Sequence, residues 1–294
     1  MILVLGGAGY MASQWAAFFR REGVEHRLVS RGEFDYSSRK GLHDLIVATR
    51  PRFLINAAGY TGIPNVDASE SKRATCLLAN TALPSLLMHV CAEHGLRWAH
   101  LSTGCIYSGN PPHGRGYNET DPPNFTFRQN RCSFYSGTKA LAEEILLQNP
   151  DIWIWRFRRP FNHIAHPRNY LTKVIGYPKH IKTENSITFL DEFLAAGWQC
   201  MREGFPGGIY HMTNPGILKT TELMDLLHRT GVSEQAYHFY NSEEEFYTEA
   251  NRTPRSECVL DSSKIRQLGV SLTEVHEALE TCLRHWNSDP KADS

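Results

Sequence analysis

A glycine-rich turn between an apolar segment and an amphipathic segment constrains the fold of this chain more than any other feature. The apolar run Ile2–Leu5 predicts a buried strand, and the spacing of the apolar residues between positions 11 and 19 predicts one helix face. The turn between them, residues 6–12, reads GGAGYMA. Glycines at this place allow a tight turn and let a pyrophosphate approach the free N–H groups at the helix N-terminus. We therefore predict a dinucleotide-binding turn rather than an ordinary strand–helix connection, with contacts from Gly6, Gly9, Tyr10 and Met11.

Short apolar runs alternate with amphipathic stretches along the first half of the chain. Because parallel strands need crossover connections, repeated strand–helix units imply a parallel sheet that is covered on both faces. We predict an α/β fold, a Rossmann-type doubly wound parallel sheet with a smaller, interleaved C-terminal substrate-binding domain. Residues 1–160 would form the Rossmann domain, with a late strand returning near 208–214, and residues 161–294 would be mainly substrate-binding. The predicted strands are Ile2–Leu5, Arg27–Ser30, Phe53–Asn56, Trp98–Ser102, Ile152–Phe157 and Ile209–Met212.

The residues after the second predicted strand bear on the choice of dinucleotide. An Asp or Glu about 20 residues after the turn would bind the ribose 2′-hydroxyl of NAD. The chain instead carries Ser30 and Arg31 there, and a hydroxyl beside a guanidinium suits a 2′-phosphate. We therefore predict an NADP-binding domain that uses NADPH. The alternative is NADH, with Arg31 as a solvated surface charge.

Composition excludes several classes of protein. Lys+Arg and Asp+Glu both number 31, so no global basic field attracts nucleic acid or an anionic membrane. We identify no apolar run near the ~18 residues of a membrane span, and no basic segment of a signal peptide precedes Gly6. The seven cysteines form no disulfide-scaffold pattern, so we expect reduced thiols and a cytoplasmic protein. His163 and His166 lack further matching ligands, so we predict no metal site.

A Tyr-x3-Lys pair follows the fourth predicted strand. Residues 135–139 read YSGTK and lead into a helix predicted over Thr138–Gln148. Tyr135 and Lys139 are four residues apart, a spacing that places both on one helix face. The ammonium of Lys139 would lower the pKa of Tyr135 and make the phenol a usable proton donor or acceptor near neutral pH. Such a pair occurs often by chance, but its position after a strand that ends in Ser102-Thr103 favours a catalytic site.

Taken together, these motifs resemble an extended short-chain dehydrogenase/reductase. Within that group the chain resembles dTDP-4-dehydrorhamnose reductases, and above all the bifunctional nucleotide-rhamnose synthase/epimerase-reductases. The resemblance implies a nucleoside-diphosphate 4-keto-6-deoxyhexose as substrate, NADPH as cofactor and a homodimer. The segments that carry it include 56–61 (NAAGYT), 66–67 (VD), 103–106 (TGCI), 123–126 (PNFT), 133–136 (SFYS), 167–173 (PRNYLTK), 213–216 (TNPG) and 253–256 (TPRS).

The resemblance also assigns roles to individual residues. Thr103 and Tyr135 would hydrogen-bond the C4 carbonyl oxygen, where negative charge develops, and Tyr135 would supply the proton. Lys139 would bind the nicotinamide ribose and tune the phenol. Asn56, Ala57 and Ala58 would also contact the cofactor.

Cys105 departs from the pattern of the monofunctional reductases. Those enzymes usually carry a tyrosine here, whereas the bifunctional family carries a cysteine. By that resemblance Cys105 is the base of a 3,5-epimerisation and Lys173 the acid that reprotonates the opposite face of the sugar. Otherwise Cys105 is a small buried hydrophobic residue and Lys173 a solvated charge.

Arginine and amide side chains suit a sugar diphosphate and sugar hydroxyls. Arg255, in its family-like setting, is the first candidate for the diphosphate. Further candidates are Arg158, Arg168 and Asn169 for the diphosphate, and Thr61, Asn65 and Asn162 for the hydroxyls.

Three functions remain open from the sequence. The first is an NADPH-dependent 3,5-epimerase/4-reductase that forms NDP-L-rhamnose from a uridine or thymidine nucleotide sugar. The second keeps the 4-ketoreduction without epimerisation. The third is a regulatory subunit that binds a dinucleotide without turnover, as the beta subunit of methionine adenosyltransferase does; the complete set of Thr103, Tyr135 and Lys139 weighs against it.

Overall fold

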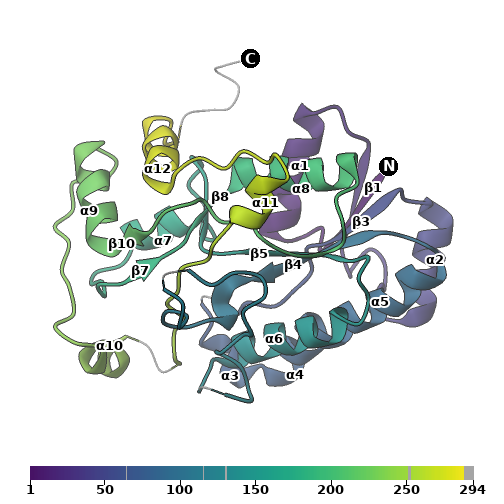
Figure 1. Ribbon diagram of the computed structural model, residues 1–294, viewed down its shortest axis with the longest axis horizontal. Coiled ribbons are helices and arrows are strands. Elements are labelled where there is room, and N and C mark those ends of the chain that lie inside the picture. Colours follow the sequence, from purple (N-terminus) through teal and green to yellow (C-terminus); the bar gives the residue numbers. More distant parts are fainter. Residues whose placement is uncertain (64, 115, 130, 251–252, 288–294) are drawn as a thin grey trace.

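A six-stranded parallel sheet forms the centre of the protein (Figure 1). The computed structural model describes residues 1–63, 65–114, 116–129, 131–250 and 253–287. The sheet order is β2-β1-β3-β4-β5-β9, and all six predicted strands are present within one residue of their predicted ends. Their bounds are β1 Ile2–Leu5, β2 His26–Val29, β3 Phe53–Asn56, β4 Trp98–Thr103, β5 Trp153–Phe157 and β9 Gly208–His211.

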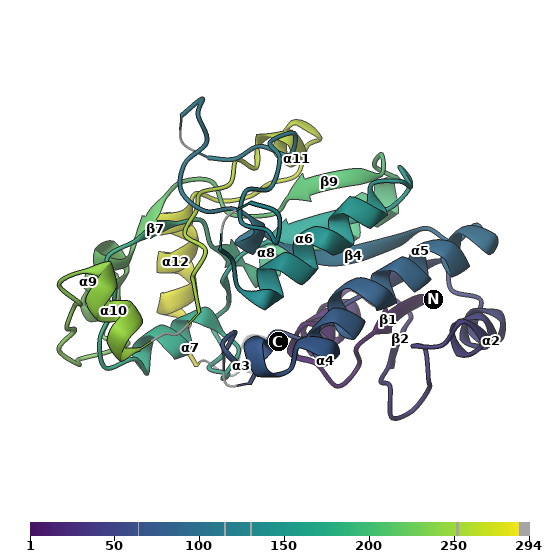
Figure 2. The same cartoon turned by 90° about the horizontal axis from the view of Figure 1, so that it is seen from below.

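Helices cover both faces of this sheet, as the doubly wound fold predicts. Alternate residues of a strand point to opposite faces, so Ile2 and Val4 pack in one core cluster while Leu3 and Leu5 pack in another. Figure 1 shows α1 and α8 on one face and α2, α5 and α6 on the other, and Figure 2 shows α5 running beside α6. The bounds of these helices are α1 Tyr10–Arg21, α2 Arg39–Thr49, α5 Leu83–Glu93, α6 Phe134–Leu146 and α8 Leu190–Glu203.

The order of the strands changes its direction at the end of β1. The chain passes from β1 to β2 on one side and then returns to β3 on the other side, so the direction of winding changes between β1 and β3. In open parallel sheets, ligands bind outside the carboxyl ends of the strands at such a switch point. The glycine-rich turn begins at this place.

One helical stretch is long and apolar although the sequence has no uninterrupted apolar run there. Among the described residues, Arg73–Glu93 is long and apolar enough to cross a membrane by length and composition alone. A search for uninterrupted apolar runs misses it because polar residues such as Asn80 lie within it. About 56% of its most apolar 18-residue segment is buried inside the protein. Within it, Asn80 Nδ2 donates to the Thr138 hydroxyl at 3.2 Å. The stretch is therefore part of the core, and a cytoplasmic location stays a prediction.

The same stretch consists of three consecutive elements. It contains α4 (Arg73–Leu77), a π-helical turn η1 (Leu78–Ala82) and α5. Pro84 is the second residue of α5, which follows the π-helical turn directly, so the irregular turn coincides with a residue that has no N–H for the helical ladder. The short helix α3 (Ala68–Ser71) precedes them.

The second half of the chain builds a smaller body and also returns to the main sheet. Two short two-stranded sheets, β10-β7 and β6-β8, accompany a core cluster formed largely by α7, α9 and α12, whereas β9 joins the main sheet beside β5. A division near residue 160 stays a prediction, and residues 288–294 lie outside the described part of the chain. The bounds are β6 Pro160–Phe161, α7 Tyr170–Ile175, β7 Glu184–Asn185, β8 Thr188–Phe189, β10 Leu218–Lys219, α9 Thr220–Arg229, α10 Glu243–Glu249, α11 Ser263–Gln267 and α12 Val275–Arg284.

Candidate active site

The carboxyl end of β4 presents Thr103 and Cys105. A short 3-10 turn, η2 (Gly104–Ile106), follows the strand directly. Thr103 caps this turn, because its Oγ1 accepts a hydrogen bond from the backbone N–H of Cys105 at 3.1 Å. Thr103 is buried and Cys105 is half-buried, so the strand end holds a hydroxyl and a thiol side by side.

Helix α6 begins at Phe134, four residues before the predicted start. Ser133 caps it by accepting from the backbone N–H of Ser136 at 3.1 Å. Glu70 Oε1 accepts from the N–H of Phe134 at 2.7 Å, and Ser69 Oγ accepts from the N–H of Tyr135 at 3.3 Å. These distant partners, which the sequence analysis missed, extend the helix so that Tyr135 and Lys139 lie one turn apart within it.

The Tyr135 side chain points to Thr103 and Cys105. Burial raises the pKa of Tyr135, and the nearby Cys105 raises it further, while a side-chain hydrogen bond with Thr103 lowers it. Lys139 is not among the groups that act most strongly on this phenol. The predicted lowering of its pKa by Lys139 is therefore wrong, because burial outweighs the charges. A phenol that stays protonated fits a proton donor.

Lys139 points instead toward the sheet. Its Nζ donates to the carbonyl of Leu101 at 2.7 Å and lies 3.0 Å from Nε2 of His100. Burial lowers the pKa of Lys139 to about 8, although Glu143 opposes the change. His100 is also buried, and its burial and the Lys139 charge keep the pKa of the ring well below its ordinary value.

His100, which the sequence analysis missed, connects Lys139 to the predicted cofactor segment. The other ring nitrogen, Nδ1, lies 3.2 Å from Nδ2 of Asn56. Oδ1 of Asn56 in turn accepts from the backbone N–H of Ala58 at 3.2 Å. A continuous line of contacts therefore runs from α6 to residues 56–58 at the end of β3.

The glycine turn lies directly against residues 57 and 58. Gly6 has a φ of +86°, and a Cβ at this position would meet the backbone N of Ala58 at 2.7 Å. A Cβ on Gly7 would lie 3.0 Å from the backbone of Val29 at the end of β2. Glycine is thus required where the ends of β1, β2 and β3 meet. Gly9 is the N-cap of α1, which receives no side-chain cap within the described chain.

Other predicted cofactor residues surround this turn. Ser30 Oγ accepts from the N–H of Glu33 at 3.3 Å, and Arg31 is exposed. Tyr36, which the sequence analysis missed, is buried against the turn: burial raises its pKa, while Arg31 and a hydrogen bond with the backbone of Gly6 lower it. Met11 lies in α1 next to Tyr10, whose ring stacks on His166 with centroids 4.4 Å apart.

Positive side chains from the second half gather near this site. Lys173 lies on α7, and burial, with smaller contributions from Arg168 and Arg255, lowers its pKa. The three cations are therefore neighbours, as a site for a diphosphate would require.

Arg168 and Arg255 reach across to the segment 60–67. Arg255 Nη2 forms an ion pair with Asp67 at 2.9 Å. Arg168 Nη1 donates to the hydroxyl of Thr61 and to the carbonyl of Gly62, both at 3.0 Å. These contacts join the predicted substrate residues of the second half to the segment 60–67 of the first half.

The predicted amide contacts have other partners. Asn162 Nδ2 donates to Gln14 Oε1 at 2.8 Å, and Asn169 caps α7 and donates to the Asn162 carbonyl at 2.8 Å. Asn65 Oδ1 accepts from the N–H of Asp67 at 2.9 Å. Because Asn162 and Asn169 are buried and use their amides within the protein, the structure gives them a scaffolding position instead of an open one.

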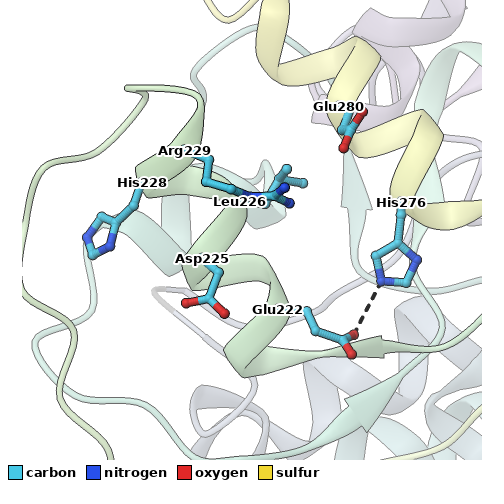
Figure 3. A pocket seen from close by; sticks show the side chains of 7 residues that line it. All are labelled: Glu222, Asp225, Leu226, His228, Arg229, His276 and Glu280. Carbon is cyan, nitrogen blue, oxygen red and sulfur yellow. Dashed lines mark hydrogen bonds and ion pairs between the residues drawn. The ribbon is translucent and has the colours of Figure 1, made fainter.

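A separate cavity lies between α9 and α12 (Figure 3). Its volume is about 660 Å³, and none of the predicted site residues lines it. Glu222 and His276 form an ion pair across it at 3.3 Å. The described residues contain no cluster of three or more His, Cys, Asp or Glu side chains that could hold a metal ion.

Comparisons with known proteins agree with this geometry. Residues 1–288 match the family described as the RmlD substrate binding domain. The chain is 32% identical over 282 residues to a bifunctional dTDP-4-dehydrorhamnose 3,5-epimerase/dTDP-4-dehydrorhamnose reductase of Arabidopsis thaliana, covering 94% of this chain and 90% of that protein. It is also 32% identical to a trifunctional UDP-glucose 4,6-dehydratase/UDP-4-keto-6-deoxy-D-glucose 3,5-epimerase/UDP-4-keto-L-rhamnose-reductase of the same plant, matching 94% of this chain but only 40% of that longer protein. The fold is similar to that of the L780 UDP-rhamnose synthase of Acanthamoeba polyphaga mimivirus, with a TM-score of 0.88 at 21% identity over 97% of this chain and 98% of that one.

Proposed function

The chain belongs to the RmlD substrate-binding domain family, and on this premise we propose that it is an NADPH-dependent NDP-4-keto-6-deoxyglucose 3,5-epimerase/4-reductase that forms NDP-L-rhamnose. The observation that carries the proposal is the meeting of a hydroxyl, a phenol and a thiol at the end of β4, from Thr103, Tyr135 and Cys105. A homodimer and a uridine or thymidine nucleotide are parts of the same proposal.

The reduction needs groups that hold and protonate the C4 carbonyl oxygen. Thr103 is among the side chains that act on the Tyr135 phenol, so one ketone oxygen held between them could accept from both. The raised pKa of Tyr135, caused first by burial, keeps its proton available for the oxygen as negative charge develops. When bound, the nicotinamide supplies the hydride.

The glycine turn fits a dinucleotide. Gly6 leaves open the space that a Cβ would fill against Ala58, and the N–H groups at the start of α1 favour an anion there. Arg31 is exposed beside the turn, where its guanidinium would bind a 2′-phosphate. NADPH is therefore the proposed cofactor and NADH the alternative.

We expect Arg31→Ser to weaken NADPH binding by about 10- to 100-fold, because charge-assisted hydrogen bonds contribute about 1.5–3 kcal/mol. NADH binding should hardly change, since NADH lacks the 2′-phosphate. Fluorescence titration of both cofactors measures the effect. The control is Arg39→Ala, which removes an exposed arginine of α2 that pairs with Glu93 of α5. Equal losses for NADPH and NADH would contradict this assignment.

The lowered pKa of Lys139 predicts an alkaline limit to activity. Burial brings this pKa to about 8, so Lys139 is an ammonium below that pH and loses its charge above it. If the ammonium binds the cofactor ribose, kcat/KM for reduction should fall as pH rises through about 8. The variant Lys139→Arg keeps its charge, so the fall in kcat/KM should move to higher pH. A fall that stays in place would assign it to another group.

The epimerisation needs a base beside the ketone and an acid on the opposite face. The C3 and C5 hydrogens both flank the C4 carbonyl, so one site that stabilises an enolate acidifies both. We assign Cys105 as the base because it lies beside Thr103, and Lys173 as the acid because it belongs to the cationic group of the second half.

We expect Cys105→Ala to separate the two activities. Incorporation of solvent deuterium at C3 and C5 should fall by about 10²- to 10⁴-fold, the usual contribution of a general base. Reduction of a ketone that has already been epimerised should survive. NMR of the product in D₂O measures both, and normal deuterium incorporation would show that the thiol is not the base.

One assay tests the proposal as a whole. The protein is incubated with UDP- or dTDP-4-keto-6-deoxyglucose and NADPH, and the stereochemistry of the product is assigned by NMR. NDP-L-rhamnose supports the proposal, whereas a product reduced without inversion at C3 and C5 identifies a monofunctional reductase. Tight NADPH binding without turnover of either sugar would instead indicate a regulatory subunit.

A further inference from the structure

Arg158 is a buried cation that contacts the candidate base. It follows β5 directly and its residue is only 1% exposed. Its Nη1 donates to the Cys105 sulfur at 3.4 Å and to the hydroxyl of Ser256 at 2.9 Å. Nε and Nη2 donate to Oδ1 of Asn185 at 3.2 and 2.5 Å, and Nη2 also reaches the Ser256 carbonyl. The five N–H groups of the guanidinium therefore all have acceptors.

Of the acceptors in these contacts, only the thiol can ionise. An amide, a hydroxyl and a carbonyl hold the guanidinium in place without neutralising it. The carboxylate of Glu257, which accepts from Asn185 behind this layer, forms its ion pair with Arg159 at 2.9 Å. A buried charge without a counter-charge is costly, so a negative sulfur at Cys105 lowers the free energy of this arrangement.

We propose that Arg158 is a positioning residue that stabilises the thiolate of Cys105 and thereby decides which group of the site carries the negative charge. This deepens the proposed epimerase function and rests on it. Three further titratable groups of the described chain face Cys105. They are Tyr135 of α6, Arg159, which follows Arg158 in the chain, and Cys258 of the segment 256–261. Burial raises the pKa of Cys258 and of Tyr135, and the Cys105 charge adds to both. The phenol and the second thiol therefore keep their protons while Cys105 acts as the base.

The proton balance of the epimerisation follows. The thiolate takes the proton from C3 or C5, the electron pair of the broken C–H bond forms the C=C bond of an enolate, and the π pair of the carbonyl moves to the C4 oxygen, held by Thr103 and Tyr135. The ammonium of Lys173 gives a proton to the opposite face of the same carbon. The resulting thiol and amine exchange a proton through solvent, so the sugar is isomerised with no net oxidation.

Alkylation of Cys105 in the protein without cofactor or substrate tests this inference. Iodoacetamide reacts with the thiolate, and peptide mass spectrometry separates Cys105 from the other six cysteines. We expect Arg158→Met to slow the reaction about ten-fold near neutral pH, and the difference to close at alkaline pH where both thiols ionise. Arg158→Lys keeps the charge but not the planar guanidinium, so its alkylation rate should lie between those of the wild-type protein and Arg158→Met. This variant replaces Arg158→Met in the test if the methionine variant does not fold. Arg97→Met, which removes a part-buried arginine whose Nη2 donates to the Phe205 carbonyl at 2.8 Å, is the control.

The outcomes separate this inference from the function on which it rests. Equal rates in the wild-type protein and the Arg158 variants, or a difference that is constant across pH, overturn the inference even if deuterium enters C3 and C5. A loss of reactivity confined to neutral pH supports it, and the same variants should then slow deuterium incorporation more than reduction of the epimerised ketone. If alkylation of Cys105 depends on Arg158 but the protein incorporates no deuterium at C3 and C5, the epimerase function is contradicted. The stabilisation of the Cys105 thiolate by Arg158 is then still supported.

Discussion

Replacing Tyr135 by phenylalanine is expected to lower the rate of ketone reduction by about 10²- to 10⁴-fold, the contribution typical of a positioned proton donor. The phenol is the protonated group next to Thr103, and its raised pKa, caused first by burial, keeps the proton in place near neutral pH. NADPH binding should be unchanged, because the line of contacts to the cofactor segment starts at Lys139 and not at Tyr135. Single-turnover oxidation of NADPH with the purified ketone measures the step.

A second tyrosine provides the control for this variant. Tyr210 lies on β9, and its hydroxyl donates to the Pro206 carbonyl at 2.8 Å, away from the site. Tyr210→Phe also loses one phenol hydrogen bond, so any effect on stability should be shared while the rate stays near that of the wild-type protein. Near-normal reduction by Tyr135→Phe would remove Tyr135 from the chemistry.

Removing the buried carboxylate of Glu143 is expected to cost about 3–5 kcal/mol of unfolding free energy, because it leaves a buried charge without its partner. Glu143 Oε2 lies 2.5 Å from Nη2 of Arg156, and both side chains are 2% exposed or less. Arg156 Nη1 also donates to the Tyr107 hydroxyl at 2.7 Å and lies 3.1 Å from Nε2 of His211. This network holds α6 against β5, and therefore fixes the helix that carries Tyr135. Urea denaturation of Glu143→Ala measures the loss as a lower midpoint with an unchanged slope.

The neighbouring residue offers a matched control. Glu144 pairs with Arg128 at 2.8 Å, but these side chains are 44% and 72% exposed. Exposed pairs contribute about 0–1 kcal/mol, so Glu144→Ala should change the midpoint little. The double variant Glu143→Leu/Arg156→Met should be more stable than either single variant, since neither charge is left alone. Equal losses at positions 143 and 144 would show that burial of the pair does not control stability.

Local patterns in the sequence predicted the frame of the molecule. The six strands were found because each is a short apolar run, and the parallel sheet followed because helical segments separate them. The glycine turn was recognised from its glycines between an apolar and an amphipathic segment, and the structure shows that Gly6 lies tightly against Ala58. These features depend on residues that are near one another in the chain.

The contacts inside the site could not be predicted in the same way. The start of α6 was placed four residues late because its first N–H groups bond to Ser69 and Glu70, more than sixty residues away. Asn162 was predicted to bind sugar hydroxyls and Asn169 the diphosphate, but a sequence does not show that each amide has a partner within the protein. The pKa of Tyr135 was predicted to fall because helical spacing reveals Lys139 but not burial.

The sequence alone determined the strands, the covering helices, the glycine turn and the residue types that meet at the ends of the strands, because periodicity and turn chemistry act over a few residues. Only the tertiary structure decided that Lys139 turns to His100 and that Arg158 turns to Cys105. Those choices depend on which donors and acceptors burial brings within hydrogen-bond distance, and the partners lie 39 and 53 positions apart in the chain.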